Sequence, residues 1–486
     1  MSRAKAVIGR FALASAAAAM AAHGADLSQP LDALINSSPL AARASIGIHV
    51  VSLTTGKPLY ARNENRFFLP ASNMKLFTTA LALEKLGPDY RFETRLMEEP
   101  SGDLALVGSG DPSMSGRVYP YQRDAAPAPP LKAIEELADQ AVAAGLSRVR
   151  GDIVGDDRLY PWAPFPPNWS QSDAAGESGA PVSALSVADN FITVTVAPGA
   201  TPGALAALSL NPPLEYFAID NRVATIAGKG EARIRVSRVP GARQLLLEGT
   251  IPAGAASATV NVAVDDPALY AACALYDALT RRGVSIDGQP VARHRSASEA
   301  YEPPQGKTLA TWLSPPASEL IQMTDKVSEN LHAELLLREV GRIEHKSGSL
   351  DNGLAAMSAF LAGIGASASE SRMDDGSGLS RNALVTPRLV TRLLSYMYAS
   401  KWRDTWVAML PVGGQDGTLS RRLCCVSDAV LIHAKTGTLN RAIALSGYAH
   451  SKTRGWLAFS ILLNDFAAPS AEAQAFVDKI ALTLTD

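Results

Sequence analysis

The order of strands and helices along this chain is the feature that most limits what it can fold into. Hydrophobic periodicity and breaker residues indicate one pattern of strands and helices at the two ends of the chain and a different one in the middle. The ends predict strands at 45–53, 58–61, 430–436, 443–449 and 456–464, with helices at 73–86 and 471–483. From about 92 to 291, short alternating strands dominate, interrupted by glycine, proline and two helical intervals, 131–144 and 267–282. The last strands and helix are therefore expected to complete a domain that the first strands and helix begin, and the β-rich middle is interpreted as an insertion.

Helices return after this block, and the chain is therefore predicted to be an α/β (α+β) protein. Further helices are expected at 328–342, 353–364 and 387–398, the first of them ending at Gly341. We divide the chain into a leader at 1–24, the first part of the main domain at 25–91, an inserted region of one or more β-rich domains at 92–305, and the second part of the main domain at 306–486.

Composition and charge exclude several classes of protein. The chain has 486 residues, of which 47% are hydrophobic and 19% charged, so it can bury a sizeable core. This balance differs from that of disordered, collagen-like and coiled-coil chains. The formal net charge of −2 provides no basic excess for holding a polyanion, which argues against nucleic-acid binding.

The first 24 residues have the pattern of a secretory signal peptide. Arg3, Lys5 and Arg10 precede an apolar run from Phe11 to Ala22 that is short for a bilayer span, and the small residue Gly24 fits a cleavage site. No later stretch reaches the roughly 18 to 20 apolar residues of a spanning helix. We therefore expect an exported, periplasmic protein with no transmembrane segment in the mature chain.

The three cysteines, Cys273, Cys424 and Cys425, do not fit a metal site or a disulfide framework. They lack C-x-x-C spacing, and their odd number allows at most one bridge within the chain. Packed or free thiols explain them as well as a single bridge does.

A serine and a lysine three residues apart stand at the start of the predicted 73–86 helix. In Ser72-Asn-Met-Lys75 this spacing puts the amine on the same side of the first turn as the hydroxyl, at the positive end of the helix dipole. A Ser/Lys nucleophile pair requires this geometry and a lysine pKa lowered by burial or a nearby cation. The pattern alone is weak, because Ser2 to Lys5 matches it inside the leader. A helix N-cap at Ser72 with a solvated Lys75 is the competing interpretation.

Two further motifs occur more than once, and their context selects among the copies. Ser-x-Asn occurs at 209–211, 328–330 and 380–382, but only Ser328 and Asn330 open a strongly amphipathic helix, where an N-cap is again the alternative. Lys-[Ser/Thr]-Gly occurs at 346–348, in a polar loop, and at 435–437, closing a strand. Lys435 is therefore the candidate, and Gly437 would let a substrate backbone approach closely.

The order S-x-x-K, S-x-N, K-T-G in these contexts is the signature of penicillin-recognising serine acyl-transfer enzymes. With the flanking segments 179–185, 375–382, 410–419 and 433–439, the chain closely resembles the class C low-molecular-mass penicillin-binding proteins over about 44–482. This is the D-alanyl-D-alanine carboxypeptidase/endopeptidase family, which also has a long insertion between its first two motifs. The resemblance implies a penicillin-recognising serine transpeptidase-like domain, with a five-stranded antiparallel sheet flanked by helices. It also implies hydrolysis of D-Ala-D-X bonds in peptidoglycan peptides, inhibition by β-lactam antibiotics, and no metal or cofactor.

The resemblance further implies a role for each motif residue. Ser72 would be the acylated nucleophile, Lys75 its base, Ser328 the proton relay to the leaving amine, and Asn330 a hydrogen-bonding partner of the peptide. Lys435 would favour the substrate's terminal carboxylate and keep Lys75 from holding its proton.

Substrate contacts follow from the same resemblance. Thr436 and Thr438 would bind the terminal carboxylate beside Gly437, and the N–H groups of Ser72 and Thr438 would form the oxyanion hole. Asp173 looks like the acid of the family's insertion that faces the amino group of the stem-peptide diamino acid. The second motif departs from the family's usual Asp and Tyr, with Glu329 and His332 in their places.

Other interpretations stay open at this point. A β-lactamase or esterase would share the three motifs but hydrolyse its acyl-enzyme quickly, and a non-catalytic peptidoglycan-binding protein would keep only the fold. A Ser-His-Asp hydrolase using His433 is disfavoured, because the sequence has no G-x-S-x-G elbow. The sequence does not decide between carboxypeptidase and endopeptidase use, nor the diamino acid, the oligomeric state or peripheral membrane association.

Overall fold

The computed structural model describes residues 26–239, 242–424 and 431–486. The predicted leader and Cys425 therefore lie outside the described residues, while Cys273 and Cys424 are free thiols. Within these three ranges, none of the helices combines the length and the apolar character that a membrane span needs.

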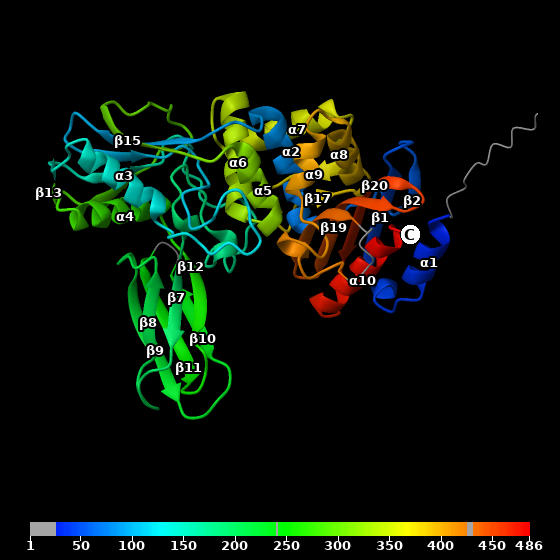
Figure 1. Cartoon of the computed structure of the whole chain (residues 1–486), viewed down its shortest axis with the longest axis horizontal. Helices are drawn as coiled ribbons and strands as arrows, with labels where there is room; N and C mark the ends of the chain where they lie inside the picture. The colour runs from blue at the N-terminus through cyan, green and yellow to red at the C-terminus, as the bar shows by residue number, and fades with distance from the viewer. Residues whose placement is uncertain (1–25, 240–241, 425–430) are drawn as a thin grey trace, which may run out of the picture.

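A five-stranded antiparallel sheet joins the two ends of the chain (Figure 1). β1 (Ser45–Ser52) pairs along its whole length with β20 (Gly455–Asn464), in a register that sets Ser45 opposite Asn464. The sheet order is β18-β19-β20-β1-β2, with β18 at Ile432–Leu439, β19 at Ala442–Ser451 and β2 at Pro58–Arg62. The five-stranded antiparallel sheet that the resemblance implies is confirmed.

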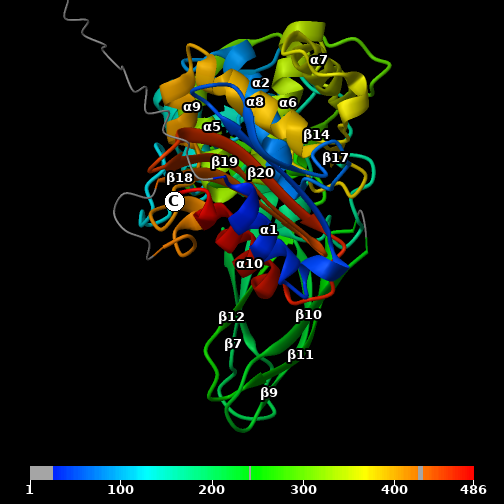
Figure 2. The ribbon, with the colours of Figure 1, turned by 90° about the vertical axis from the view of Figure 1, so that its right-hand side faces the viewer.

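Helices cover both faces of this sheet (Figure 2). On one face α10 (Ser470–Thr483) packs with α1 (Ser28–Asn36), a helix that the sequence analysis did not predict, and Leu31 and Phe476 share a core with Ile48. The helices of the other side are α2 (Met74–Leu86), α5 (Ala317–Val327), α6 (Asn330–His345), α7 (Leu350–Gly363), α8 (Pro387–Ala399) and α9 (Arg403–Met409). Residues Met74 to Leu83 of α2 are all buried, so this helix forms the centre of that layer.

The helix expected to open at Ser328 differs from its prediction at both ends. α5, which was not predicted, ends at Val327, and Ser328 follows it with a left-handed φ of 65°. α6 begins only at Asn330, so Ser328 occupies a corner between two helices and is not an N-cap. α6 also continues past Gly341, because that residue faces α7, where a Cβ would lie 2.5 Å from the Gly353 nitrogen.

The middle of the chain forms two connected lobes, and Figure 1 shows the second projecting away from the first. The first contains a sheet in the order β14-β6-β4-β3-β15, a short pair of strands, β5 and β13, and helices α3 (Lys132–Ala143) and α4 (Pro267–Arg281). Its strands are β3 Glu93–Glu98, β4 Leu104–Val107, β5 Arg148–Val149, β6 Ile153–Asp156, β13 Ser285–Ile286, β14 Pro290–Arg293 and β15 Lys307–Leu313.

The second lobe consists of two three-stranded sheets, β12-β7-β8 and β10-β11-β9. Their strands are β7 Phe191–Ala197, β8 Ala207–Asn211, β9 Ala218–Ile226, β10 Arg233–Arg238, β11 Gln244–Pro252 and β12 Ala258–Ala263. Because β15 pairs with β3, the sheet of the first lobe extends beyond the predicted boundary at 305. We propose that the insertion runs from about 92 to 313.

Candidate active site

Ser72 and Lys75 meet at the start of α2, as their spacing predicts. Ser72 lies in the single 3₁₀ turn Ala71–Asn73, and Lys75 is fully buried in the first turn of the helix. The Lys75 Nζ lies 3.2 Å from the Ser72 Oγ and donates to the Asn330 Oδ1 at 2.5 Å. Burial lowers the pKa of Lys75 to about 8, although nearby acids, Asp375 first among them, oppose the shift. The ammonium can therefore lose its proton near neutral pH.

The backbone just before Ser72 is strained. Ala71 has a φ of 47°, in the left-handed region that a Cβ disfavours. Gly378, with a φ of 79°, packs directly against the Ala71 carbonyl. A Cβ at Gly378 would lie 1.9 Å from the Ala71 oxygen. The neighbouring Ser377 carbonyl accepts a hydrogen bond from the Lys75 Nζ at 2.8 Å. One turn thus fixes both the serine and the lysine.

Two buried acids hold this turn, and the sequence analysis gave neither a role. The two oxygens of Asp375 accept from the N–H groups of Gly378 and Ser380, each at 2.8 Å. The Glu334 Oε1 accepts from the N–H groups of Gly376 and Ser377, each at 2.9 Å. The Asp-Gly-Ser-Gly sequence is the available signal, since Asp favours turns in which its side chain caps the backbone that follows.

Ser328 and Lys435 form the second half of the site. The Lys435 Nζ donates to the Ser328 Oγ at 2.8 Å and to the Thr436 carbonyl at 3.0 Å. Lys435 is fully buried, and burial together with the positive charge of Lys75 lowers its pKa. The Asn73 Nδ2 donates to the Lys435 carbonyl at 2.9 Å, which ties β18 to the turn that carries Ser72.

The remaining residues of the third motif face different surroundings. The Thr436 hydroxyl donates to the Thr418 hydroxyl at 2.8 Å, while Thr438 is exposed. At Gly437 a Cβ would lie 2.8 Å from the Pro70 carbonyl oxygen. A side chain at this position would therefore meet the chain just before Ser72, while the close approach of a substrate backbone to Gly437 stays a prediction.

Asp173 lies in the loop 168–179, which borders the site from the insertion. Two contacts join this loop to the main domain: the Trp169 Nε1 donates to Asp375 at 2.9 Å, and the Asn330 Nδ2 donates to the Ser178 carbonyl at 2.8 Å. Asp173 is half-buried, and its carboxylate accepts a hydrogen bond from Ser170 within the loop. The loop is in place beside Asn330, whereas a contact of Asp173 with substrate stays a prediction.

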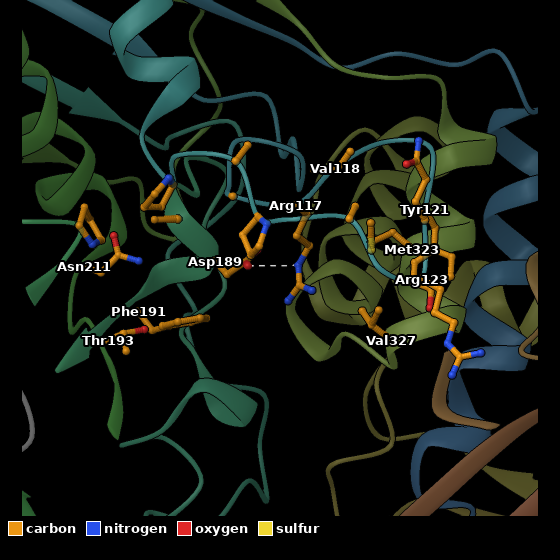
Figure 3. Close-up of a pocket in the computed structure, with 18 residues that line it drawn as sticks. Arg117, Val118, Tyr121, Arg123, Asp189, Phe191, Thr193, Asn211, Met323 and Val327 are labelled. Atoms are coloured by element: carbon orange, nitrogen blue, oxygen red, sulfur yellow. Dashed lines mark ion pairs between the residues drawn. The ribbon is translucent and has the colours of Figure 1, made fainter. Parts of the chain in front are cut away.

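Glu329 and His332, the two residues of the second motif that differ from the family's usual ones, face the insertion. Glu329 pairs with Arg117, and the Arg117 Nε lies 3.1 Å from Asp189 (Figure 3). The buried His332 lies 3.4 Å from the same Asp189 carboxylate. Burial favours the neutral acid, but the charges and hydrogen bonds of Arg117 and His332 together outweigh burial and lower the pKa of Asp189. Arg117 also lines a cavity of about 410 Å³ that extends to Val327, next to Ser328. Glu329 and His332 therefore join the helix corner to the insertion.

His433 does not take part in this arrangement. Its ring lies 5.9 Å from that of Trp456, whereas the Ser72 hydroxyl faces Lys75. Burial lowers the pKa of His433. The alternative of a Ser-His-Asp hydrolase has no support in these contacts.

The site combines a serine beside a buried lysine, a Ser/Asn corner between two helices, and a lysine on the adjoining strand of the sheet. This combination defines a penicillin-recognising serine enzyme. The chain belongs to the D-Ala-D-Ala carboxypeptidase 3 (S13) family, whose sequence profile matches residues 27–484. The predicted family and fold are thereby confirmed.

Individual relatives cover nearly the whole chain. It is 33% identical to the D-alanyl-D-alanine carboxypeptidase of Actinomadura sp. (strain R39), over 95% of this chain and 85% of that one. It is 24% identical to the D-alanyl-D-alanine carboxypeptidase DacB of Haemophilus influenzae, over 92% of each. The crystal structure of penicillin binding protein 4 from H. influenzae matches with a TM-score of 0.78 at 22% identity, covering 93% of this chain and 97% of that one. A β-lactam complex of the same protein matches with a TM-score of 0.71 at 22% identity over the same shares of both chains.

Proposed function

We propose that this protein is a D-alanyl-D-alanine carboxypeptidase that hydrolyses peptidoglycan stem peptides through an acyl-enzyme on Ser72. The observation that carries the proposal is the buried Lys75 amine, 3.2 Å from the Ser72 hydroxyl and with a pKa lowered to about 8. A neutral amine at this position can take the hydroxyl proton as the oxygen attacks. Family membership and the relative with 33% identity support the same activity.

The reaction would proceed in two balanced steps. The Ser72 oxygen bonds to the D-Ala carbonyl carbon, its proton passes to Lys75, and the N–H groups of Ser72 and Thr438 stabilise the oxyanion. Ser328, 2.8 Å from the Lys435 amine, gives its proton to the departing D-Ala nitrogen as the C–N bond breaks, and the proton that Lys75 took from Ser72 passes to Ser328. Water then attacks the ester carbon, and the ester C–O bond breaks. The water oxygen completes the carboxyl group of the shortened peptide, and a proton of that water goes to the Ser72 oxygen.

The finer statements on location and inhibition belong to the same proposal. The basic start and apolar run of residues 1–22 support export by a signal peptide to the periplasm. A β-lactam amide resembles the scissile bond, so β-lactams should acylate Ser72 and persist there.

Comparing the turnover of peptide and penicillin tests the proposal. The protein should release D-Ala from a pentapeptide and form a long-lived adduct with a labelled penicillin. Fast penicillin hydrolysis without D-Ala release would indicate a β-lactamase, and the absence of both adduct and release would indicate a binding protein. Mass spectrometry of the products and of the intact protein gives both measurements.

Replacing Lys435 by alanine should lower kcat/KM for the pentapeptide by about 10- to 150-fold, because a charged hydrogen bond to the substrate carboxylate is lost. The exposed Lys346, in the other Lys-Ser-Gly copy, provides the matched control, and Lys346→Ala should leave turnover unchanged. Steady-state release of D-Ala measures both variants. Unchanged turnover in Lys435→Ala would remove this lysine from substrate binding.

Replacing Asp173 by asparagine should lower kcat/KM for diaminopimelyl-D-Ala-D-Ala peptides by about five- to 150-fold, because a carboxylate–ammonium contact is lost. An analogue with an acetylated side-chain amine should be almost unaffected. Glu177→Gln, an exposed acid of the same loop, is the control variant. Equal losses on both substrates would assign Asp173 a structural role, and no loss would make it a spectator.

A further inference from the structure

A second cavity lies in the insertion, on the side of the 168–179 loop that faces the two lobes. It has a volume of about 700 Å³, within the range of small-molecule sites. Its walls come from residues 162–175, from Arg238 at the end of β10, from Asp265 and Asp266 before α4, and from His294 after β14.

Three aromatic side chains form the apolar part of this cavity. Trp162, Phe165 and Trp169 all line it, and Phe165 is 39% exposed. One face of Trp162 is covered by His294, whose ring lies 3.8 Å away and nearly parallel. Aromatic rings gathered at a cavity rather than in a core mark a recognition surface.

The polar part of the cavity includes the Arg238 guanidinium, which lies over the Phe217 ring and has one nitrogen without a hydrogen bond among the described residues. The Arg238 side chain is only 7% exposed, its nearest carboxylate oxygen, on Asp265, lies 4.0 Å away, and its Nη1 has no hydrogen-bond acceptor among the described residues. A buried donor left unpaired is costly unless a ligand supplies the acceptor. Arg238 therefore indicates a ligand that carries an oxygen acceptor.

Two cations and two carboxylates line the cavity, and Asp157 adds a third carboxylate behind His294. This disfavours an anionic ligand, while the unpaired Arg238 nitrogen disfavours a cationic one. Arg238 and His294 face Asp265 and Asp266, and His294 lies 2.9 Å from Asp157 and 3.2 Å from Asp266. Burial opposes the imidazolium, but these two acids outweigh it and raise the pKa of His294 to about 10. An anionic ligand would meet the two aspartates, and a purely apolar one would leave Arg238 unpaired.

We propose that this cavity binds an amino-sugar unit of the peptidoglycan glycan, a proposal that rests on the function proposed above. A pyranose has C–H faces that stack on aromatic rings and hydroxyls that donate to carboxylates. Its N-acetyl carbonyl is a neutral acceptor suited to Arg238. Aromatic faces, two carboxylates and an unpaired guanidinium thus match the three kinds of group on this one neutral ligand.

The position of the cavity fits the sugar end of the same substrate. Trp169 lines the cavity and donates to Asp375, which holds the turn whose Ser377 carbonyl accepts from Lys75. Four residues of stem peptide separate the sugar from the scissile bond, a span of about 13 to 14 Å when extended. The peptide would follow the 168–179 loop, past Asp173, from the cavity to Ser72.

The test compares a disaccharide-linked pentapeptide with the free pentapeptide. Wild-type protein should cleave the linked substrate with the higher kcat/KM, and Phe165→Ala should lower that value by about 2- to 12-fold while leaving the free peptide unchanged. Phe67→Ala, which removes a 49% exposed phenylalanine that does not line the cavity, is the control and should change neither value. Penicillin labelling of Ser72 in each variant shows that it is folded.

The outcomes distinguish failure of the proposed sugar site from failure of the proposed carboxypeptidase activity. If neither substrate yields D-Ala, the carboxypeptidase proposal fails. If both are cleaved and Phe165→Ala affects them equally or not at all, the sugar site is overturned. If an N-acetylglucosamine oligomer competes with the linked substrate and quenches tryptophan fluorescence, the cavity also binds a neighbouring glycan strand. If Phe165→Ala lowers kcat/KM for the linked substrate but the oligomer does not compete, the cavity binds only the substrate's own sugar.

Discussion

Replacing Ser72 by alanine will abolish the penicillin adduct and reduce D-Ala release by at least about 1,000-fold, the scale of effect seen when a serine nucleophile is removed. The adduct requires an ester with the Ser72 oxygen, and a β-lactam acyl-enzyme has no leaving group that can diffuse away. Intact-mass measurement after incubation with labelled penicillin, with peptide mapping of the wild-type protein, should show one adduct and place it on Ser72.

The fold should survive this substitution. The Ser72 hydroxyl has Lys75 as its neighbour, and removing one oxygen from a half-buried position leaves little empty space. Thermal unfolding of the variant should therefore resemble that of the wild type. An adduct on any other serine, or one that persists in Ser72→Ala, would overturn the assignment of the nucleophile.

Replacing Lys75 by arginine is expected to lower the rate of acylation by about 100- to 10,000-fold, the range that a general base contributes. A guanidinium keeps its proton near neutral pH and cannot accept the one on Ser72. Lys85→Arg, in the exposed last turn of the same helix, is the matched control and should acylate normally. The rate of penicillin adduct formation measures both variants, and retained acylation in Lys75→Arg would exclude this lysine as the base.

The wild-type protein offers a second check on Lys75. Because its pKa is lowered to about 8, the neutral form is present above that pH and is lost as the pH falls through it. The acylation rate should therefore rise with pH towards about 8. A rate independent of pH between 6 and 9 would contradict a titrating base.

Short-range spacing predicted the parts of the site that depend on a single element. Ser72 and Lys75 meet because residues three apart share one face of a helical turn. Lys435 was selected because a strand was predicted to end at Thr436, but in the structure Lys435 lies inside β18, which continues to Leu439. The corner at Ser328 was missed because the strong period of α6 concealed the break, where Ser328 ends α5 as a left-handed C-cap whose N–H donates to the Thr324 carbonyl. Sequence patterns report local periodicity, not how two helices meet.

Long-range contacts were out of reach for the same reason. The partners of Glu329 and Asp375, Arg117 and Trp169, are each about 200 residues away in the chain. The positive φ of Ala71 depends on the fit of Gly378 against its carbonyl. No periodicity encodes either relation, because each is imposed by tertiary packing.

The bond from Asn330 to the Ser178 carbonyl has a consequence for protein engineering. Excising the insertion would leave the Asn330 amide, which contacts Lys75, without its acceptor, and would remove the Trp169 donor from Asp375. A shortened version that keeps all three sequence motifs would thus lack one contact that fixes a motif side chain, that of Asn330, and one that supports the turn beside Lys75. The three motifs are therefore not a portable catalytic unit in this chain, and a minimal enzyme would have to supply replacements for both contacts.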